Sequence, residues 1–153
     1  LIKMDRKSRR NQNSNSMSII LCILKALLLI SACVTISLAE KYYGDYQVGI
    51  IIGIAAITIL YCCVSFILDI AIQCKCREQR SCCVVAELIF STGGFCGWLI
   101  SLGTAITISL RTGSRTTQLF GWIGVCCGIE VALFIAMIAI YLTQWVGYYI
   151  RRH

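Results

Sequence analysis

The chain has 153 residues, of which 58% are hydrophobic and only 14% are charged, and its formal net charge is +7. This composition is typical of a membrane protein and excludes an ordinary soluble domain. Because the basic residues lie near the ends of apolar runs, the positive charge indicates orientation in a membrane and not a nucleic-acid partner.

Four apolar runs follow one another, at about residues 18–39, 48–72, 83–110 and 118–149. Each exceeds the roughly 20 residues that a helix needs to cross a hydrocarbon core of about 30 Å. The sequence therefore predicts an all-α fold, an integral membrane four-helix bundle over residues 18–149. Residues 1–17 are expected to form a basic cytosolic tail, disordered because of the polar stretch Asn11–Ser16, and residues 150–153 a second cytosolic tail.

Basic residues crowd one side of the four spans. They precede the first span, occupy the middle connection and follow the fourth span, whereas Lys41, Arg111 and Arg115 flank the other side. Since cytosolic segments carry the excess of lysine and arginine, both termini are expected in the cytosol, in the plasma membrane or in secretory-pathway vesicles. Contacts with anionic lipid are expected from Arg9, Arg10, Lys75, Arg77, Arg80, Arg151 and Arg152.

Three charged residues are expected in the cytosolic half of the membrane. Lys25 lies about two turns into the first span, Asp69 about one turn from the cytosolic end of the second, and Glu87 about one turn into the third. A lysine stem can reach along a helix, so Lys25 can pair with Glu87 or Asp69. We interpret the three as an ion pair or snorkelling side chains, although intramembrane charges often mark functional sites.

The connection between the second and third spans combines four cysteines with basic residues. Juxtamembrane cysteines in such surroundings are typical acceptors of S-palmitoylation, and unmodified thiols are the alternative interpretation. A zinc site is a third, although the spacing is not that of a paired knuckle. No disulfide is expected, because neither expected outer segment contains a cysteine. The four candidates are Cys74, Cys76, Cys82 and Cys83.

Small residues recur at four-residue intervals on the second, third and fourth spans. Such ridges let helix backbones approach closely in lipid. We expect them to pack within the bundle, with contact to a second copy as the alternative. The ridge residues are Gly49, Gly53, Gly93, Gly97, Ser101, Gly124, Gly128 and Ala132.

Glu130 is the most deeply placed charged residue. Counted from Gln118, it lies about 18 Å from the outer surface, near the middle of the bilayer. Tyr61 and Trp98 reach a similar depth on their spans. One interpretation is a neutral carboxylic acid hydrogen-bonded to Tyr61 or Trp98, because an unpaired charge is costly at this depth. A site for a proton, an ion or a lipid headgroup is the alternative.

The chain resembles the MARVEL family of four-span membrane proteins from about Ser18 to Tyr149. The resemblance rests on Ile19–Leu29 in the first span and on Ala86–Phe90, continuing through Gly97 and Trp98, in the third. Short outer segments and cytosolic termini also fit. The resemblance implies a role in vesicle traffic, specialised lipid membranes or cell junctions, and it implies no catalytic residue.

Three other four-span classes fit the sequence less well. The long outer loops of claudins and the Cys-rich second outer loop of tetraspanins are missing. Proteolipid ring subunits of rotary ATPases share an acidic residue in the fourth span, at the place of Glu130, but their termini have the opposite orientation.

The sequence favours a non-enzymatic membrane-organising protein, of the membrane-trafficking, membrane-apposition or cell-junction type, that packs laterally with itself, with lipids or with partner membrane proteins. No Ser/His/Asp set or phosphate-binding loop is recognisable, and no cofactor, metal or nucleic acid is expected. A homo-oligomer or a fixed membrane partner is expected. An accessory subunit of a channel, transporter or receptor is one alternative, and an ion- or proton-translocating protein that uses Glu130 is another.

Overall fold

The computed structural model describes residues 2–42, 46–75, 80–111 and 114–150, with side chains for 16–41, 46–69, 83–111, 118–147 and 149–150. Every element in these ranges is helical, which confirms the predicted all-α four-helix transmembrane bundle. The elements are α1 (Ile2–Ala39), the 3₁₀ turn η1 (Glu40–Tyr42), α2 (Tyr46–Lys75), α3 (Arg80–Arg111) and α4 (Ser114–Tyr149).

Each long helix contains a segment that is long and apolar enough to cross a membrane. In hydrocarbon the backbone must satisfy its own hydrogen bonds, so an apolar run of this length folds as a helix. The chain has no proline, so nothing removes a donor from the helix interiors. The candidate spans, each within three residues of its expected limits, are Ser16–Ala39, Tyr46–Asp69, Cys83–Arg111 and Gln118–Gly147.

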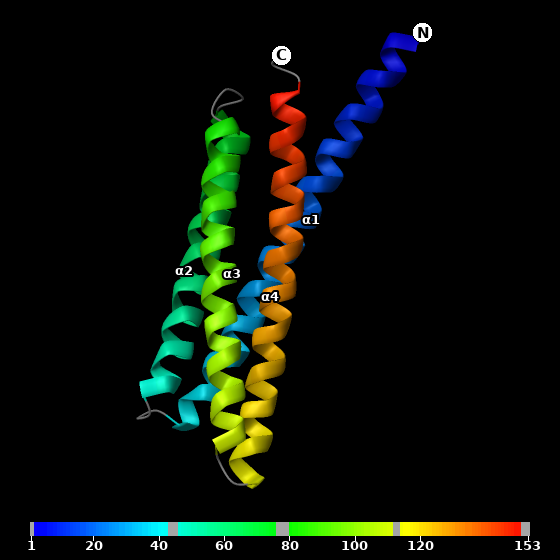
Figure 1. Ribbon diagram of the computed structural model, residues 1–153. Helices are drawn as coiled ribbons and strands as arrows, with labels where there is room; N and C mark the ends of the chain where they lie inside the picture. The colour runs from blue at the N-terminus through cyan, green and yellow to red at the C-terminus, as the bar shows by residue number, and fades with distance from the viewer. Residues whose placement is uncertain (1, 43–45, 76–79, 112–113, 151–153) are drawn as a thin grey trace.

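Helix α1 departs from the expected organisation at its start. It begins at Ile2 and so includes residues 2–17, which the sequence analysis expects to be a disordered tail. Once a helix has nucleated, each added residue gains one backbone hydrogen bond, and a leader without proline can continue the apolar span. The first turns of α1 extend away from the other three helices (Figure 1).

The helices run alternately up and down (Figure 1). The start of α1, the end of α2, the start of α3 and the end of α4 lie at one end of the bundle, and the other helix ends lie at the opposite end. Helices α3 and α4 make the most extensive contact, α1 touches both α2 and α4, and α2 and α3 share a smaller interface. The bundle therefore closes around one interior.

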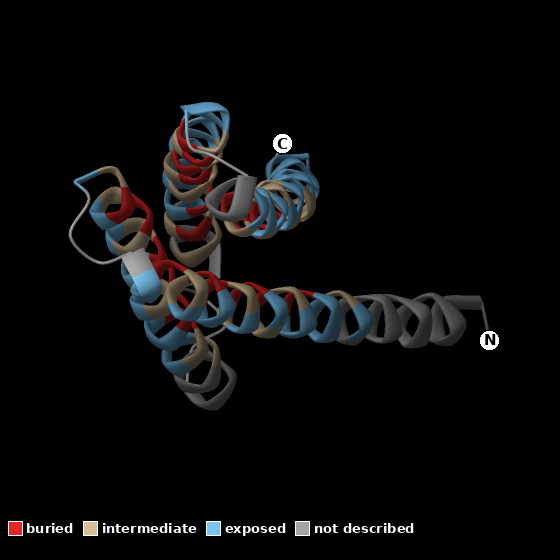
Figure 2. Ribbon diagram, turned by 90° about the horizontal axis from the view of Figure 1, so that it is seen from below, coloured by how far each residue is buried: buried red, intermediate tan, exposed pale blue. Residues whose placement is uncertain are grey.

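The buried residues of the four helices turn toward this interior, and the exposed residues turn outward (Figure 2). Large apolar side chains cover the outer surface of every span, for example Ile30, Ile57, Phe90 and Val125. The interior is mixed, because an apolar core surrounds several polar side chains. The buried polar side chains are Lys25, Thr35, Thr58, Ser65, Glu87, Ser91, Ser101 and Glu130.

Helix α4 has 36 residues. At about 1.5 Å per residue such a helix is roughly 54 Å long, well beyond a hydrocarbon core of about 30 Å. It must tilt, extend past the membrane surface, or both.

The ridges of small residues divide into two groups. Gly97 packs against Ile54 of α2, since a Cβ at Gly97 would lie 3.4 Å from Ile54 Cγ2, and Ser101 is buried. At five ridge glycines a Cβ would meet nothing within 4 Å. The expectation that these glycines pack inside the bundle is therefore wrong. They are Gly49, Gly53, Gly93, Gly124 and Gly128. Ala132 is exposed as well.

The tight helix contact on α3 is made by Gly94, which the ridge pattern skips. A Cβ at Gly94 would lie 2.5 Å from the ring of Phe134 on α4. A four-residue spacing identifies a stripe of small residues, but it does not say whether that stripe faces a neighbouring helix. The rotation of α3 in the bundle determines that Gly94, and not the adjacent Gly93, contacts α4.

Candidate functional site

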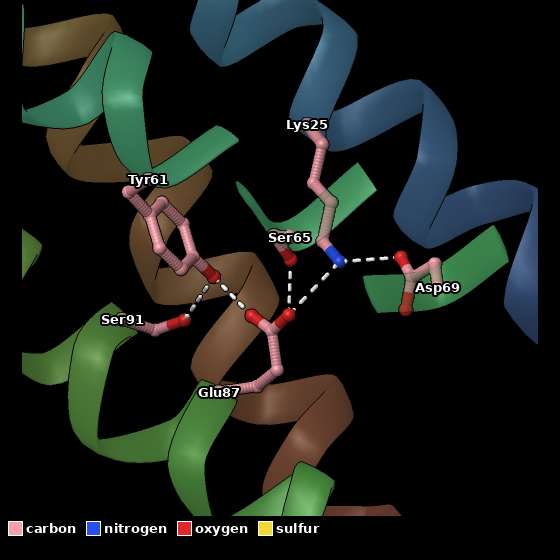
Figure 3. A network of polar contacts seen from close by, with 6 residues as sticks. All are labelled: Lys25, Tyr61, Ser65, Asp69, Glu87 and Ser91. Atoms are coloured by element: carbon pink, nitrogen blue, oxygen red, sulfur yellow. Dashed lines mark hydrogen bonds and ion pairs between the residues drawn. The ribbon is translucent and has the colours of Figure 1, made fainter. Parts of the chain in front are cut away.

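A cluster of polar side chains joins α1, α2 and α3 (Figure 3). At its centre, Lys25 Nζ lies 2.6 Å from Asp69 Oδ2 and 3.2 Å from Glu87 Oε1. Lys25 is only 1% exposed, so its ammonium group depends on these two carboxylates. The structure thus brings Lys25 together with both partners that the sequence offers. We call this group the Lys25 cluster: Lys25, Tyr61, Ser65, Asp69, Glu87 and Ser91.

Glu87 accepts hydrogen bonds on both carboxylate oxygens. Ser65 donates to Oε1, which Lys25 also reaches, and Tyr61 donates to Oε2. Ser91 Oγ lies 3.5 Å from the Tyr61 hydroxyl. On α4, the buried Tyr141 interacts with the same carboxylate. All four helices therefore contribute to the surroundings of Glu87, and its charge is compensated inside the bundle.

Helical periodicity explains this arrangement. Tyr61, Ser65 and Asp69 are spaced by four residues on α2, and Glu87 and Ser91 are spaced by four on α3. Residues at this spacing lie on one face, so each helix presents a polar strip to its neighbour. Ser65, Ser91 and Tyr141 are not among the residues predicted from the sequence. The four-residue spacing would have identified the two serines, whereas Tyr141 resembles other interfacial tyrosines.

The cluster holds one positive charge between two negative charges. Asp69 is at the edge, with its side chain 48% exposed, and Lys25 and Glu87 lie deeper. Removing one member of a buried ion pair typically costs about 3–5 kcal/mol, because it leaves an uncompensated charge. The Lys25 cluster therefore fixes α1, α2 and α3 in one mutual arrangement.

Trp98 makes a separate contact between α3 and α2. Its indole Nε1 donates to Thr58 Oγ1 at 2.9 Å, and Thr58 in turn donates to the carbonyl of Ile54 at 3.0 Å. Trp98 is fully buried. Its only donor is satisfied by this contact and is not available to Glu130.

Glu130 has neither of the partners that the sequence analysis proposes. Tyr61 donates to Glu87, Trp98 donates to Thr58, and within the described part of the chain both oxygens of Glu130 lack a hydrogen-bond partner. The expected hydrogen bond to Tyr61 or Trp98 is therefore wrong. Counting residues gives the depth of a side chain, but not the direction in which its helix points it.

The surroundings of Glu130 are weakly polar. The residue is 0% exposed. Ser31 of α1 lies close to its carboxyl without meeting hydrogen-bond geometry, and the thiols of Cys62, Cys126 and Cys127 also face it. Ser101 Oγ is a third buried polar atom without a partner among the described residues. The bundle interior thus contains two polar groups. The Lys25 cluster has its hydrogen bonds satisfied, whereas the carboxyl of Glu130 has no hydrogen-bond partner among the described residues.

Most of the residues that the sequence predicts at the cytosolic surface have side chains outside the described ones. These are Cys74, Cys76, Cys82 and all the residues expected to contact anionic lipid. Cys83 is half-buried, and the cysteines with described side chains form no disulfide.

Comparison of the chain with known protein families, with curated proteins and with solved structures finds no match. The resemblance to the MARVEL family stays a prediction. The evidence for the candidate site is therefore the arrangement of its side chains.

Proposed function

We propose that the chain is a non-enzymatic membrane-organising protein that acts by lateral packing with itself, with lipids or with partner membrane proteins. The role fits membrane trafficking, membrane apposition or cell junctions. Four candidate spans take up most of the chain, so little of it is left outside the membrane to carry chemistry.

The observation that carries this proposal is the contrast between the inside and the outside of the bundle. In the described spans, Lys25, Glu87 and Glu130 are buried inside the bundle, and Lys25 pairs with Glu87 and with Asp69 at the edge of the cluster. Large apolar side chains cover most of the outer surface of all four helices. The exposed hydroxyls of Ser37, Thr92, Thr104 and Thr107 donate to carbonyls of their own helices. A bundle whose helices are held together by internal ion pairs, and whose outer surface is mainly apolar, is suited to contacts with lipid and with other membrane helices.

The open glycines of α4 supply a surface for such contacts. Gly124 and Gly128 have room for a side chain, and both lie on the same face of the helix. Close backbone approach at small residues is how helices associate where the hydrophobic effect is absent. A second copy or a partner helix would be able to pack here without disturbing the core.

Native mass spectrometry in gentle detergent tests the proposal. We expect oligomers from the wild-type chain and a shift toward monomer in the double variant Gly124→Leu, Gly128→Leu. Gly103→Leu is the matched control, because Gly103 is also open but lies outside the α4 ridge, and it should leave the oligomer intact. A wild-type chain that is monomeric and purifies without a membrane partner would contradict the proposal. A fixed heteromeric partner would instead favour the accessory-subunit alternative.

A second candidate function is ion or proton translocation through Glu130. It is favoured by one observation, the fully buried carboxyl without a hydrogen-bond partner. Flux measurements on reconstituted protein test it. Flux that is present in the wild type and lost in Glu130→Gln, with the fold intact, would establish transport, and a wild type without flux would exclude it.

We further propose that both termini face the cytosol, and that the connecting segment with Cys74, Cys76, Cys82 and Cys83 is palmitoylated beside anionic lipid. Support comes from the asymmetry of basic residues in the sequence and from the start of α1, the end of α2, the start of α3 and the end of α4, which lie at the same end of the bundle (Figure 1). An N-terminal tag that is labelled on unpermeabilised cells would contradict the orientation. A chain without hydroxylamine-sensitive acyl groups would contradict the modification.

A further inference from the structure

Glu130 differs from Lys25, Asp69 and Glu87 in having no hydrogen-bond partner among the described residues. Its side chain is 0% exposed, and neither carboxyl oxygen has a hydrogen bond to a described residue. The two donors at similar depth are used elsewhere, Tyr61 by Glu87 and Trp98 by Thr58. The carboxyl therefore lies in the apolar centre of the bundle without compensation.

No cation is placed to balance a charge on Glu130. Lys25 and the terminal Arg111 are the basic residues within the described spans, and Lys25 is held by Asp69 and Glu87. From α1, Glu130 faces Ser31; from α2, it faces the thiol of Cys62; on α4 itself, the neighbours are Cys126 and Cys127. Helix α3 contributes no charged group to these interactions. An ionised carboxylate here would be strongly unfavourable, because nothing in these surroundings replaces its hydration.

Phe134 lies between Glu130 and the Lys25 cluster. It is one turn from Glu130 on the cytosolic side of α4, and it is 1% exposed. Its ring packs against Gly94 of α3, and its centroid is 6.5 Å from that of Tyr61, the residue that donates to Glu87. A buried aromatic ring thus separates the Lys25 cluster from Glu130.

We propose that Glu130 is a proton-binding site in the centre of the bundle, occupied at neutral pH, and that Phe134 is the barrier between this site and the cytosolic side. Binding forms an O–H bond between the carboxylate and a proton taken from water, and it removes one negative charge from the interior. Release breaks the same bond and returns the proton to water. The site is independent of the oligomeric state, so this proposal can fail while the membrane-organising role stands.

The arrangement also says what release requires. A deprotonated Glu130 has no partner in this packing, so the bundle must admit water or bring a cation to it. Either change moves α4 relative to α1 or displaces Phe134. The proton on Glu130 therefore holds the closed packing of the bundle.

Infrared spectroscopy of the full chain in lipid vesicles at pH 7 tests the occupancy of the site. Carboxyl groups in water or in ion pairs are ionised at this pH, so a protonated carboxylic acid gives a distinct C=O stretching band. We expect this band in the wild type, its loss in Glu130→Gln, and its persistence in the matched control Glu87→Gln. A wild type without the band, or a band that survives Glu130→Gln, would overturn the proposal.

Exchange into D₂O tests the barrier, since deuteration shifts the same band. We expect slow exchange in the wild type, and exchange faster by about tenfold or more in Phe134→Ala, where water reaches Glu130; tenfold corresponds to about 1.4 kcal/mol. Ile135→Ala, on the outer face of the same helix, is the control and should exchange like the wild type. Phe134→Leu serves if the alanine variant does not fold, and it should give an intermediate rate. Equal rates in the wild type and the folded Phe134 variant would overturn the barrier.

Discussion

Two glutamates are buried on the facing helices α3 and α4, and their surroundings are opposite. Glu87 accepts from Lys25, Tyr61 and Ser65. Glu130 is buried even more completely and accepts from no described residue. The difference shows that burial alone does not decide the role of an intramembrane carboxyl. The partners that neighbouring helices present decide whether the carboxyl is a charged group in an ion pair between helices or a neutral acid.

Helix register explains why the partners gather at only one glutamate. The polar strip of α2 consists of Tyr61, Ser65 and Asp69, and it faces Glu87 and Ser91 in the first half of α3. At the level of Glu130, α2 presents Cys62 instead, a weak hydrogen-bonding group. The cluster around Glu87 is thus built from polar side chains of α1, α2 and α3, whereas Glu130 is a single carboxyl group without such partners.

The largest expected effect comes from removing the cation that Glu87 and Asp69 share. Lys25→Met keeps most of the side-chain volume but leaves two carboxylates without their ammonium partner. We expect a loss of about 3–5 kcal/mol in the free energy of unfolding, because breaking a buried ion pair leaves uncompensated charge. Titration with a denaturing detergent, followed by circular dichroism, measures this loss.

Lys41→Met is the matched control for this substitution. Lys41 is exposed at the opposite end of the bundle, in η1, and the change should leave stability within about 0.5 kcal/mol. Equal stability of the two variants would show that the Lys25 cluster does not fasten the helices.

A smaller effect is expected at the packing that separates Glu130 from the Lys25 cluster. In Gly94→Ala the new Cβ would lie 2.5 Å from the Phe134 ring, so the ring or α3 must shift. Overpacking of this kind typically costs about 1–3 kcal/mol. The neighbouring Gly93→Ala meets nothing within 4 Å, and it should be neutral or stabilising by up to about 1 kcal/mol because alanine favours the helix.

The same denaturation assay distinguishes the two glycines. If Gly93→Ala were the more harmful change, α3 would be rotated relative to the packing described, and Phe134 would not separate Glu130 from Glu87.

Several features of the fold follow from the sequence with little ambiguity. Apolar runs long enough to cross a membrane must be helices, and their number and approximate limits agree with the candidate spans. The partners of Lys25 could also be anticipated, because Asp69 and Glu87 are the carboxyl groups at a comparable depth in the same half of the bundle. Depth is proportional to residue number along a helix, so it can be counted.

The remaining features depend on helix rotation, which residue number does not give. Tyr61 and Trp98 have a depth similar to that of Glu130, yet they point to Glu87 and Thr58. The ridge of Gly93 and Gly97 has the expected spacing, yet the closest approach to α4 is at Gly94. In both cases the rotation of one helix against its neighbours determines which residues its side chains contact. This rotation is set by the packing of the whole bundle.

The central claim is that Glu87 is a charged group in an ion pair between helices and that Glu130 is a neutral acid. The same substitution at both positions tests this claim most directly. Glutamine has the shape of glutamic acid but cannot carry the charge. Glu87→Gln should lower the free energy of unfolding by about 1–3 kcal/mol, because Lys25 loses a charged partner, whereas Glu130→Gln should change it by less than about 0.5 kcal/mol. Equal losses at the two positions, or the larger loss at Glu130, would contradict the account.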